Sequence, residues 1–493
     1  MIQYIIKEVE NMFLTKSKFN IGLNCPRCFW NAMKETGIEE SLSPQEELSK
    51  EDVEIRRLAK SLFDNTVDLS NKDFESDKAT LEGLPLKTVI FGAGFKAFNL
   101  YARVDILVPS EDDGYDLIEV RSSTKVKDEF IYEVAFQKYV CEKAGLKIKE
   151  CKVMHLYDSY IKKGETNLNE LLVTINITEK VEGFYDEIPK ILRRLHKISE
   201  LAEAPVLSVN KYLLKEYPCE FNSECWSFLP KDNASELYRI NKDKVVKLFM
   251  NNIFEIKKVP DAALNKNQLI QKKAIINNET YINKEEINKF IKQLQYPIYY
   301  FNIEAFNEAV PRFYGTKPYA QIPFQYSVFV QEEKGKLEHH EFLHRENTSP
   351  KKSILESILK VLGNKGSIVV FNAKFQKTRL KELASLYPEH NTAVEKILNR
   401  IVDLAGPFTG FHYYNPLQKG SCSIKNILTA VTGGSYEESV LDTSELYLKA
   451  TLGEELSEEE KNKVFLTLLE ECKQDIKAMV DIVSHMGTGL LTT

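Results

Sequence analysis

Two acidic residues interrupt otherwise apolar strand patterns early in the chain, and they constrain the fold more than any other feature. Asp105 lies in the segment RVDILV, and Glu119 lies in DLIEVRSS. A turn containing Asp112, Asp113 and Gly114 separates the two segments. Burial of a carboxylate is unfavourable unless a cation or another partner compensates its charge. Two carboxylates at neighbouring strand ends therefore predict shared cation binding.

The second of these strands places a base beside the acid pair. Glu119 and Arg121 are two positions apart, so their side chains should project from the same face of the strand. Carboxylates that hold Mg²⁺ suit phosphodiester cleavage, because the metal can orient a water molecule or neutralise the phosphorane. The helical segment that follows carries Gln137 and Tyr139. The alternative interpretation is a salt-bridged strand pair in another α/β domain.

This pattern resembles the RecB-like branch of the PD-(D/E)XK nuclease superfamily. The resemblance implies an α/β, restriction-endonuclease-like domain in which Asp105 and Glu119 bind Mg²⁺ or Mn²⁺. It also implies catalytic roles for Arg121, Gln137 and Tyr139. The family position that Arg121 occupies is normally Lys, and Arg cannot exchange a proton at neutral pH. Cleavage could therefore be weakened or lost, with Lys125 as a less well-placed substitute.

Four of the eight cysteines form two short-range pairs, Cys25 with Cys28 and Cys219 with Cys225. Pairs that flank one domain predict a metal clamp, and four thiolates suit either Zn²⁺ or an iron–sulfur cluster. The segments LTKSKFNIGLNCPRCFW and YPCEFNSECW resemble RecB-like nucleases with a [4Fe–4S] cluster, a group that includes CRISPR spacer-acquisition exonucleases. Those proteins use one N-terminal and three C-terminal cysteines, whereas this chain offers two and two. Four unrelated thiols are the alternative.

A second α/β pattern begins near residue 296. The strand YPIYYFNIEAF precedes a hairpin, FQYSVFVQEEKGKLEHHEFL, and then helices and strands alternate, which predicts an RNase H-like domain. The order of motifs resembles the DEDD 3′–5′ exonucleases. That resemblance places Asn302, Glu304, Gln376 and Asp475 at the metal-binding positions, with Asp403 as a further acid. Two of these four are neutral amides, which predicts a degenerate and inactive second site. Ordinary structural acids are the alternative.

The 493 residues are too many for one domain and divide by pattern into three parts. We expect a nuclease domain with flanking cysteine pairs at 1–231, a helical connector at 232–295 and a DEDD-like domain at 296–493. The halves together resemble an uncharacterised bacterial family that fuses these two domain types. The formal net charge of −6 does not by itself favour nucleic-acid binding, which would need a local basic surface.

These features predict a metal-dependent DNA nuclease or DNA-processing protein of the RecB-like type. The expected partner is nucleic acid, with DNA favoured over RNA. The apolar runs are too short for a signal peptide or a membrane span, so a cytoplasmic location and no membrane partner are expected. The alternative is a catalytically inactive protein that binds nucleic acid or acts as a scaffold while retaining two nuclease folds.

Overall fold

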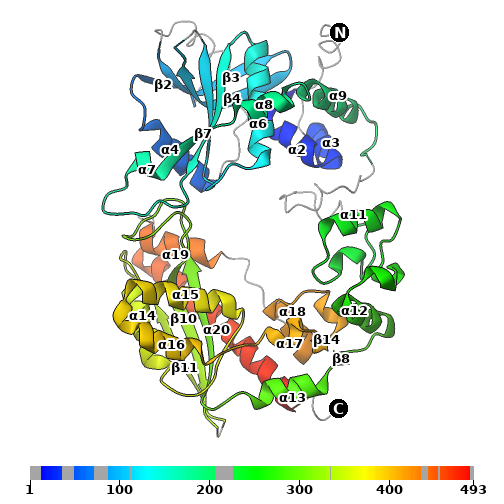
Figure 1. Ribbon diagram of the computed structural model, residues 1–493, viewed down its shortest axis with the longest axis vertical. Coiled ribbons are helices and arrows are strands. Elements are labelled where there is room, and N and C mark those ends of the chain that lie inside the picture. The colour runs from blue at the N-terminus through cyan, green and yellow to red at the C-terminus, as the bar shows by residue number, and fades with distance from the viewer. Residues whose placement is uncertain are drawn as a thin grey trace. The chain divides into compact units, whose positions relative to one another are not determined.

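The chain has a mixed α/β architecture, seen in a computed structural model that describes residues 13–35, 49–70, 87–111, 114–205, 226–333, 335–434, 442–453 and 456–488. It divides into two compact units (Figure 1). The first comprises Met1–Phe228 and Glu308–Ala320, and the second comprises Leu229–Asn307 and Gln321–Thr493. Segment 232–295, expected to be a connector, therefore packs as part of the second unit. A short segment from the C-terminal half belongs to the first unit, which the sequence did not predict.

The first unit is built on a seven-stranded mixed sheet. Its strands are β1 (Leu14–Thr15), β2 (Thr66–Asp68), β3 (Val89–Ala97), β4 (Leu100–Pro109), β5 (Tyr115–Arg121), β6 (Ile148–Leu156) and β7 (Leu172–Asn176). They lie in the order β2-β3-β4-β5-β6-β7, with β1 paired to β4. Strands β3, β4 and β5 form an antiparallel meander, and β6 runs parallel to β5.

Helices cover both faces of this sheet. They are α2 (Lys16–Asn24), α3 (Pro26–Glu35), α4 (Lys50–Lys60), α6 (Asp128–Lys143), α7 (Leu168–Leu171), α8 (Thr178–Tyr185) and α9 (Ile188–Ser199). Side chains alternate between the faces of a strand, so neighbouring residues enter different cores. Leu117 of β5 packs with α6, whereas Ile118 and Val120 pack with Ile55 and Ala59 of α4.

The second unit contains a five-stranded sheet and a separate two-stranded sheet. The strands are β8 (Tyr281–Ile282), β9 (Ile298–Phe306), β10 (Ile322–Gln331), β11 (Leu337–Leu343), β12 (Ile368–Val370), β13 (Ile401–Asp403) and β14 (Tyr413–Tyr414). The larger sheet has the order β11-β10-β9-β12-β13, while β8 pairs with β14. Strands β9, β10 and β11 are antiparallel, and β12 is parallel to both β9 and β13.

Some helices of the second unit cover the two faces of its larger sheet, and others pack away from that sheet. The α-helices are α11 (Lys242–Met250), α12 (Lys266–Asn277), α13 (Lys284–Lys292), α14 (Lys351–Val361), α15 (Ala373–Leu386), α16 (Asn391–Leu398), α17 (Gly406–Thr409), α18 (Ile424–Thr432), α19 (Thr443–Leu452) and α20 (Glu458–Thr488). Short 3₁₀ turns are η1 (Ala234–Glu236), η2 (Ile256–Lys258), η3 (Asp261–Ala263), η4 (Pro388–His390) and η5 (Pro416–Gln418).

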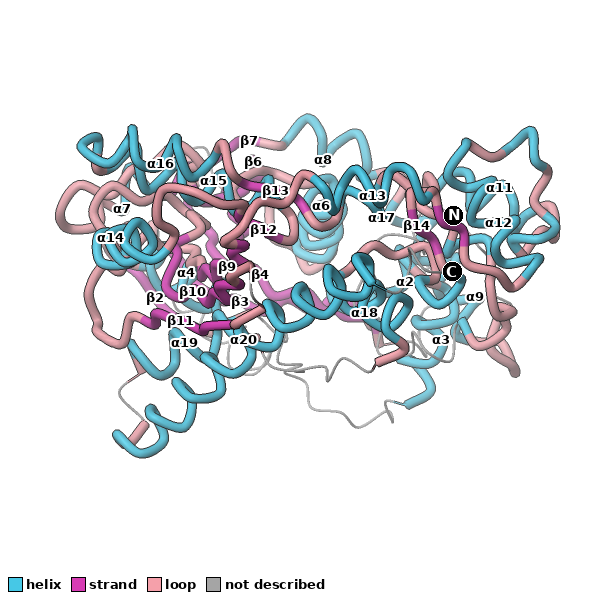
Figure 2. The backbone as a smooth tube through the Cα atoms, turned by 90° about the horizontal axis from the view of Figure 1, so that it is seen from below, coloured by secondary structure: helices cyan, strands magenta, loops and turns pink. Residues whose placement is uncertain are grey.

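Strand β9 shows how the second core is divided. Ile298 and Tyr300 pack on the face that carries α13, α18 and α20, whereas Phe301 and Ile303 pack with α14 and α15. Asn302 continues the first of these faces because it lies two positions after Tyr300. The long helix α20 (Figure 2) packs against β9 and β10, so polar residues on this face of β9 meet α20.

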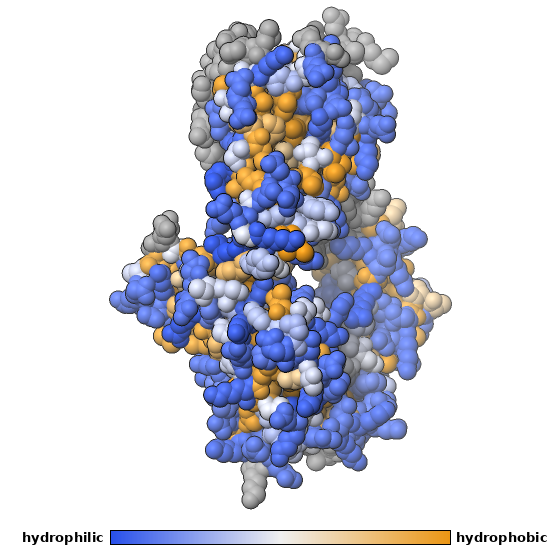
Figure 3. Space-filling model, turned by 60° about the vertical axis from the view of Figure 1, so that its left-hand side comes forward, coloured by the Kyte–Doolittle hydropathy of each residue, from blue (hydrophilic) through white to orange (hydrophobic). Residues whose placement is uncertain are grey.

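Both units present polar surfaces. The face drawn in Figure 3 is hydrophilic over most of its area, with apolar side chains in patches between charged ones. No helix among the described residues is long and apolar enough to cross a membrane.

Candidate functional site

The two acids that the sequence singled out occupy neighbouring antiparallel strands of the first unit. Asp105 lies on β4 and Glu119 on β5. The Glu119 side chain has no exposed surface, and Asp105 is only 8% exposed. An oxygen of Asp105 accepts a hydrogen bond from the backbone N–H of Val120 at 2.8 Å, which ties the two strands together beside the acids.

Three basic side chains surround Glu119, each from a different element. Lys16 Nζ of α2 lies 3.0 Å from Glu119 Oε1, and an Arg121 nitrogen of β5 lies 2.8 Å from the same oxygen. One guanidinium nitrogen of Arg56, on α4, lies 3.1 Å from Asp105 Oδ1 and 3.7 Å from Glu119 Oε1. A single cationic nitrogen thus contacts both acids. We call Asp105, Glu119, Lys16, Arg56 and Arg121 the acid–cation cluster.

The charges decide the ionisation of Glu119. Burial alone would raise its pKa, but Lys16, Arg121 and Arg56 outweigh that effect and hold the pKa of Glu119 well below its usual range. Glu119 can therefore be treated as a carboxylate at neutral pH. Removal of the surrounding charges would leave a fully buried carboxylate, so the cations stabilise the fold as well as the charge state.

Gln137 holds the second oxygen of Glu119. Its side-chain nitrogen, on α6, donates to Glu119 Oε2 at 2.7 Å and to the backbone oxygen of Arg103 at 2.9 Å. Gln137 is fully buried, so this pair of hydrogen bonds fixes the orientation of the carboxylate. The structure therefore brings together Asp105, Glu119, Arg121 and Gln137 of the residues that the sequence indicated.

Tyr139 lies elsewhere. It is two positions after Gln137 on α6, and two positions turn an α-helix by more than half a revolution. Its ring packs 5.7 Å from the ring of Tyr185 on α8, within the hydrophobic core, where it is 8% exposed. The structure therefore places the Tyr139 ring in the core and not in contact with the acid–cation cluster.

Glu133 forms a second carboxylate contact for Arg121 that the sequence did not suggest. The Arg121 guanidinium pairs with Glu133 of α6, and Asn20 of α2 donates to the other Glu133 oxygen at 2.7 Å. Arg121 also lies over the Phe130 ring, with its guanidinium carbon 5.0 Å from the ring centre. Arg121 is thus held between two acids and an aromatic face.

Lys16, Arg56 and Glu133 were missed because the sequence offers little to single them out. Lys16 is 4% exposed although it begins a helix, and Arg56 lies between the buried residues Ile55 and Ala59 on α4. A buried lysine needs a charged or hydrogen-bonding partner, but the sequence around Lys16 gives no sign that its side chain is buried. Only the packing of α2, α4 and α6 on the sheet identifies these side chains as part of the site.

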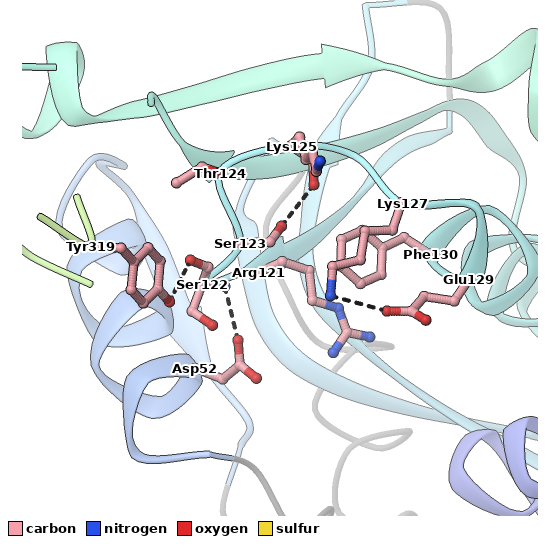
Figure 4. Close-up of a pocket in the computed structure, with 10 residues that line it drawn as sticks. All are labelled: Asp52, Arg121, Ser122, Ser123, Thr124, Lys125, Lys127, Glu129, Phe130 and Tyr319. Carbon is pink, nitrogen blue, oxygen red and sulfur yellow. Dashed lines mark hydrogen bonds and ion pairs between the residues drawn. The ribbon is translucent and has the colours of Figure 1, made fainter. Parts of the chain in front are cut away.

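An open pocket of about 450 Å³ adjoins the acid–cation cluster at Arg121, and Figure 4 shows the residues that line it. The pocket is lined by Asp52, Arg121, Ser122, Ser123, Thr124, Lys125, Lys127, Glu129, Phe130 and Tyr319. All of these residues belong to the first unit, since Tyr319 lies in the Glu308–Ala320 segment. Lys125, which the sequence indicated as a substitute base, thus lies at the pocket and not among the acids.

The residues of the acid–cation cluster can be tested for fit to a divalent ion. Mg²⁺ is commonly held by one or two carboxylates and completed by water and substrate phosphates. Asp105 and Glu119 supply two carboxyl groups, and these already share one cationic nitrogen of Arg56. No group of three or more His, Cys, Asp or Glu side chains suited to a metal was found within the described residues. A metal would also have to displace Arg56 from between the acids.

The N-terminal cysteine pair is buried at the junction of α2 and α3. Cys25 and Cys28 are each 6% exposed, and Cys25 Sγ accepts a hydrogen bond from the Cys28 N–H at 3.4 Å. Hydrogen bonding from Cys28 lowers the pKa of Cys25 to about 6 despite burial. A thiolate is the form that binds metal. Cys219 and Cys225 lie outside the described residues.

The second unit brings together the four residues predicted there. Asn302 Nδ2 donates to Glu304 at 2.7 Å and to Asp475 of α20 at 3.2 Å. Gln376 Nε2 of α15 donates to Asn302 Oδ1 at 2.8 Å, while Gln376 Oε1 accepts from the backbone N–H of Ile303 at 3.1 Å. We call Asn302, Glu304, Gln376 and Asp475 the amide–acid cluster.

Burial and a neighbouring acid change the ionisation of this second cluster. Burial, together with the nearby Asp475 charge, raises the pKa of Glu304 to about 7. Asp403 makes a different set of hydrogen bonds from the amide–acid cluster. Its two side-chain oxygens accept from the backbone N–H groups of Ala373 and Ala405, each at 3.0 Å. Asp403 therefore fixes the start of α15.

Comparison with known proteins gives two similarities. Residues 299–423 match the family described as "Domain of unknown function (DUF2779)", and this segment contains Asn302, Glu304 and Gln376. The uncharacterized protein MG366 of Mycoplasma genitalium is 24% identical over 410 residues, which cover 70% of this chain and 60% of that protein. The chain therefore matches less than two thirds of the length of this relative. The two similarities support an uncharacterised family with a domain of unknown function.

Proposed function

We propose that the first unit is a metal-dependent nuclease that hydrolyses phosphodiester bonds of nucleic acid, with DNA as the favoured substrate. The observation that carries this proposal is the contact of one Arg56 nitrogen with both Asp105 and Glu119. Two carboxyl groups on adjacent strands that already share one cation are the kind of ligand pair that would hold Mg²⁺ or Mn²⁺.

The topology of the first unit supports a restriction-endonuclease-like, RecB-type domain. An antiparallel β3-β4-β5 meander leads through α6 to β6, which is parallel to β5. The resemblance to RecB-like nucleases implies acids on two successive strands and a glutamine on the helix that follows them. Asp105, Glu119 and Gln137 occupy β4, β5 and α6 respectively.

Asp105 and Glu119 would hold the metal, which would polarise the phosphate and help to generate the attacking hydroxide. Gln137 fixes Glu119 through its hydrogen bond, so the carboxylate is oriented before metal or substrate arrives. Lys16 neutralises Glu119 from the α2 side. Arg121 can contact the phosphate if its pairing with Glu133 is exchanged for the substrate.

A second candidate function is nucleic-acid binding without cleavage. The three basic residues of the acid–cation cluster already neutralise Asp105 and Glu119, so the site is stable in the absence of a metal ion. Arg121 in place of the usual lysine also removes a group able to exchange a proton. In that case the protein would use the same surface to bind a phosphate backbone.

A degradation assay separates the two functions. Full-length protein should degrade single- or double-stranded DNA in Mn²⁺, and Glu119→Gln should lose that activity while keeping its fold. Glu165→Ala changes an exposed glutamate of the same unit and should leave activity unchanged. If the unmodified protein degrades no DNA, nucleic-acid binding without cleavage remains as the candidate function. A mobility-shift titration at several salt concentrations would then measure the affinity for DNA.

For the second unit we propose an RNase H-like, DEDD-type fold with an inactive site. The strand order β11-β10-β9-β12-β13, with β10 antiparallel to β9 and β12 parallel to it, supports this proposal. The convergence of the amide–acid cluster supports it as well. Asn302 and Gln376 carry no charge, so only two acids remain to offset a divalent ion.

The cysteine pairs are proposed to hold a [4Fe–4S] cluster, with Zn²⁺ as the alternative. The lowered pKa of Cys25 supports this, because it favours the thiolate form beside a second buried thiol. An anaerobic visible spectrum tests it directly, since thiolate-ligated iron gives a broad shoulder near ~400 nm. Full-length protein with Cys25→Ser should lose the shoulder, while Cys422→Ser should retain it. A colourless, metal-free protein would contradict both forms of the proposal.

A further inference from the structure

We propose that the pocket beside Arg121 binds a nucleoside phosphate, namely the phosphorylated terminal nucleotide of the strand that the acid–cation cluster engages. The inference rests on the proposed function, since it identifies the part of the substrate that occupies this pocket. The pocket volume of about 450 Å³ falls within the range of small-molecule binding sites.

The basic residues of the pocket can contact a phosphate. Arg121, Lys125 and Lys127 line it, together with Asp52 and Glu129. Asp52 is committed to the backbone, because it accepts from the Ser122 N–H at 2.9 Å. Glu129 and Lys127 form an ion pair at 3.4 Å with both side chains more than half exposed, so this pair is readily exchanged for a ligand.

The loop between β5 and α6 adds hydroxyl groups to these charges. Ser122, Ser123 and Thr124 follow Arg121 directly and line the pocket. Ser123 Oγ donates to the backbone oxygen of Lys125 at 2.8 Å, which holds the loop in its turn and leaves the oxygen able to accept. Guanidinium, ammonium and hydroxyl groups together form the donor set that a phosphate monoester needs.

Two aromatic rings contribute apolar surface to the same pocket. Phe130 is 5% exposed and carries the Arg121 guanidinium over its ring. Figure 4 shows Tyr319 on the other side of the loop, with its hydroxyl directed at Ser122. A base can pack against an aromatic ring or an arginine plane regardless of its sequence. Phosphate donors and ring surfaces in one pocket favour a nucleotide over a simple anion.

Tyr319 is held in an unfavourable backbone conformation. Its φ angle of 56° lies in the left-handed region, which an aromatic residue rarely adopts. Two hydrogen bonds stabilise it, from the Tyr319 N–H to Glu308 O at 2.8 Å and from its hydroxyl to Ser122 O at 2.9 Å. A strained backbone conformation that nearby hydrogen bonds hold in place at the wall of a pocket is typical of ligand-binding sites.

The pocket adjoins the proposed cleavage site through Arg121. Arg121 lines the pocket, and its guanidinium lies 2.8 Å from Glu119 in the acid–cation cluster. A phosphodiester bound at Asp105 and Glu119 would therefore have an adjoining nucleotide within reach of the pocket. A strand end with a terminal phosphate would supply the additional charge that Lys125 and Lys127 can bind.

The experiment measures binding of 12-nucleotide single strands to full-length protein in EDTA, by fluorescence anisotropy. Three forms are compared: 5′-phosphorylated, 3′-phosphorylated and unphosphorylated. We expect one phosphorylated form to bind about tenfold more tightly than the unphosphorylated strand, as a charge-assisted hydrogen bond would give. The double variant Lys125→Ala/Lys127→Ala and the single variant Tyr319→Ala should each remove that increment, whereas exposed Lys163→Ala should not.

The outcomes distinguish the pocket from the proposed nuclease function. Equal affinity for all three strands would overturn the pocket assignment, even if the protein binds and degrades DNA. Persistence of the increment in the double variant would overturn it as well. If thymidine monophosphate binds competitively with inorganic phosphate but the protein degrades no DNA in Mn²⁺, the pocket is correct and the proposed nuclease function fails. Tyr319→Phe keeps the ring and should retain most of the increment, which controls for loss of structure in Tyr319→Ala.

Discussion

Lys16 Nζ lies 3.0 Å from Oε1 of Glu119, a contact between residues 103 positions apart in the chain. Both side chains are almost completely buried, at 5% and 0% exposed. The ion pair therefore joins the start of α2 to the middle of the sheet. It makes the N-terminal helix part of the site, although the sequence marked only the strand residue.

The first prediction concerns this ion pair. Lys16→Met should lower the free energy of unfolding by roughly 2–4 kcal/mol, because the buried Glu119 carboxylate would lose one of its cations. Arg121 and Arg56 remain, so the loss should stay below that of a fully uncompensated charge. Urea denaturation measures the change, with Lys163→Met as the exposed control. A Lys16→Met protein as stable as the original would show that the ion pair contributes nothing net.

The second prediction tests whether Arg56 stands where a metal would bind. Arg56→Gln should raise the affinity for Mn²⁺ by roughly three- to tenfold, because it removes the cation that both carboxylates share. Calorimetry measures the affinity, and Arg57→Gln, an exposed neighbour on α4, is the matched control. Weaker or unchanged Mn²⁺ binding in Arg56→Gln would mean that the acids form a structural ion-pair network.

The third prediction concerns Arg121. Arg121→Lys should increase Mn²⁺-dependent DNA cleavage by roughly tenfold or more, because a lysine can exchange a proton where arginine cannot. Arg121→Ala should instead abolish cleavage and leave Glu133 without its guanidinium partner. Single-turnover cleavage rates measure both variants. A slower Arg121→Lys enzyme would show that the planar guanidinium is the required group.

The fourth prediction is a pH dependence that originates in Glu304. Burial and Asp475 raise its pKa to about 7, so the folded state retains a proton that the unfolded state releases. The contribution of Glu304 to the free energy of unfolding is fully present below about pH 4.3, the pKa of a glutamate in the unfolded chain. This contribution is lost as pH rises towards 7. Glu304→Gln should therefore increase the free energy of unfolding at pH 8 by roughly 1–3 kcal/mol and have little effect at pH 4.

Thermal or urea unfolding of full-length protein between pH 4 and 8 measures this effect, with exposed Glu333→Gln as the control. The opposite trend, with Glu304→Gln less stable at pH 8 than the original protein, would show that Glu304 is ionised and well compensated in the folded state.

The fifth prediction restores charge to the amide–acid cluster. Asn302→Asp combined with Gln376→Asp should raise Mg²⁺ or Mn²⁺ affinity measurably, because two carboxylates replace two neutral oxygens beside Glu304 and Asp475. Calorimetry in a Glu119→Gln background isolates this cluster from the first. No gain in affinity by a folded double variant would show that the likeness to an exonuclease site is accidental.

Part of the candidate site could be read from sequence because strand periodicity is local. The two-residue spacing of Glu119 and Arg121 predicts a shared face, and the structure places their charged atoms 2.8 Å apart. The helical residues were harder to assign to the site from sequence. Tyr139 lies two positions after Gln137, so the two side chains point to different faces of the helix. Its ring lies in the core against Tyr185 instead.

Lys16 and Arg56 could not be found because their roles depend on how α2 and α4 pack on the sheet. Local sequence does not encode these long-range contacts. More of the fold of the second half could be predicted, since β9 and the β10–β11 hairpin follow the predicted segments closely. Segment Glu308–Ala320 was missed because a stretch between two strands of one sheet gives no local sign that it packs with another unit.

That segment has a consequence for how the protein is made. The first unit is completed only by residues that follow strand β9, so a ribosome must synthesise part of the second unit before the first can close. A nascent chain halted at residue 228 would lack Tyr319, which lines the pocket. It would also lack Ala309, which is part of a hydrophobic core of the first unit. Maturation of the two units is therefore interleaved in time, and the pocket should become competent only after residue 320 has left the exit tunnel.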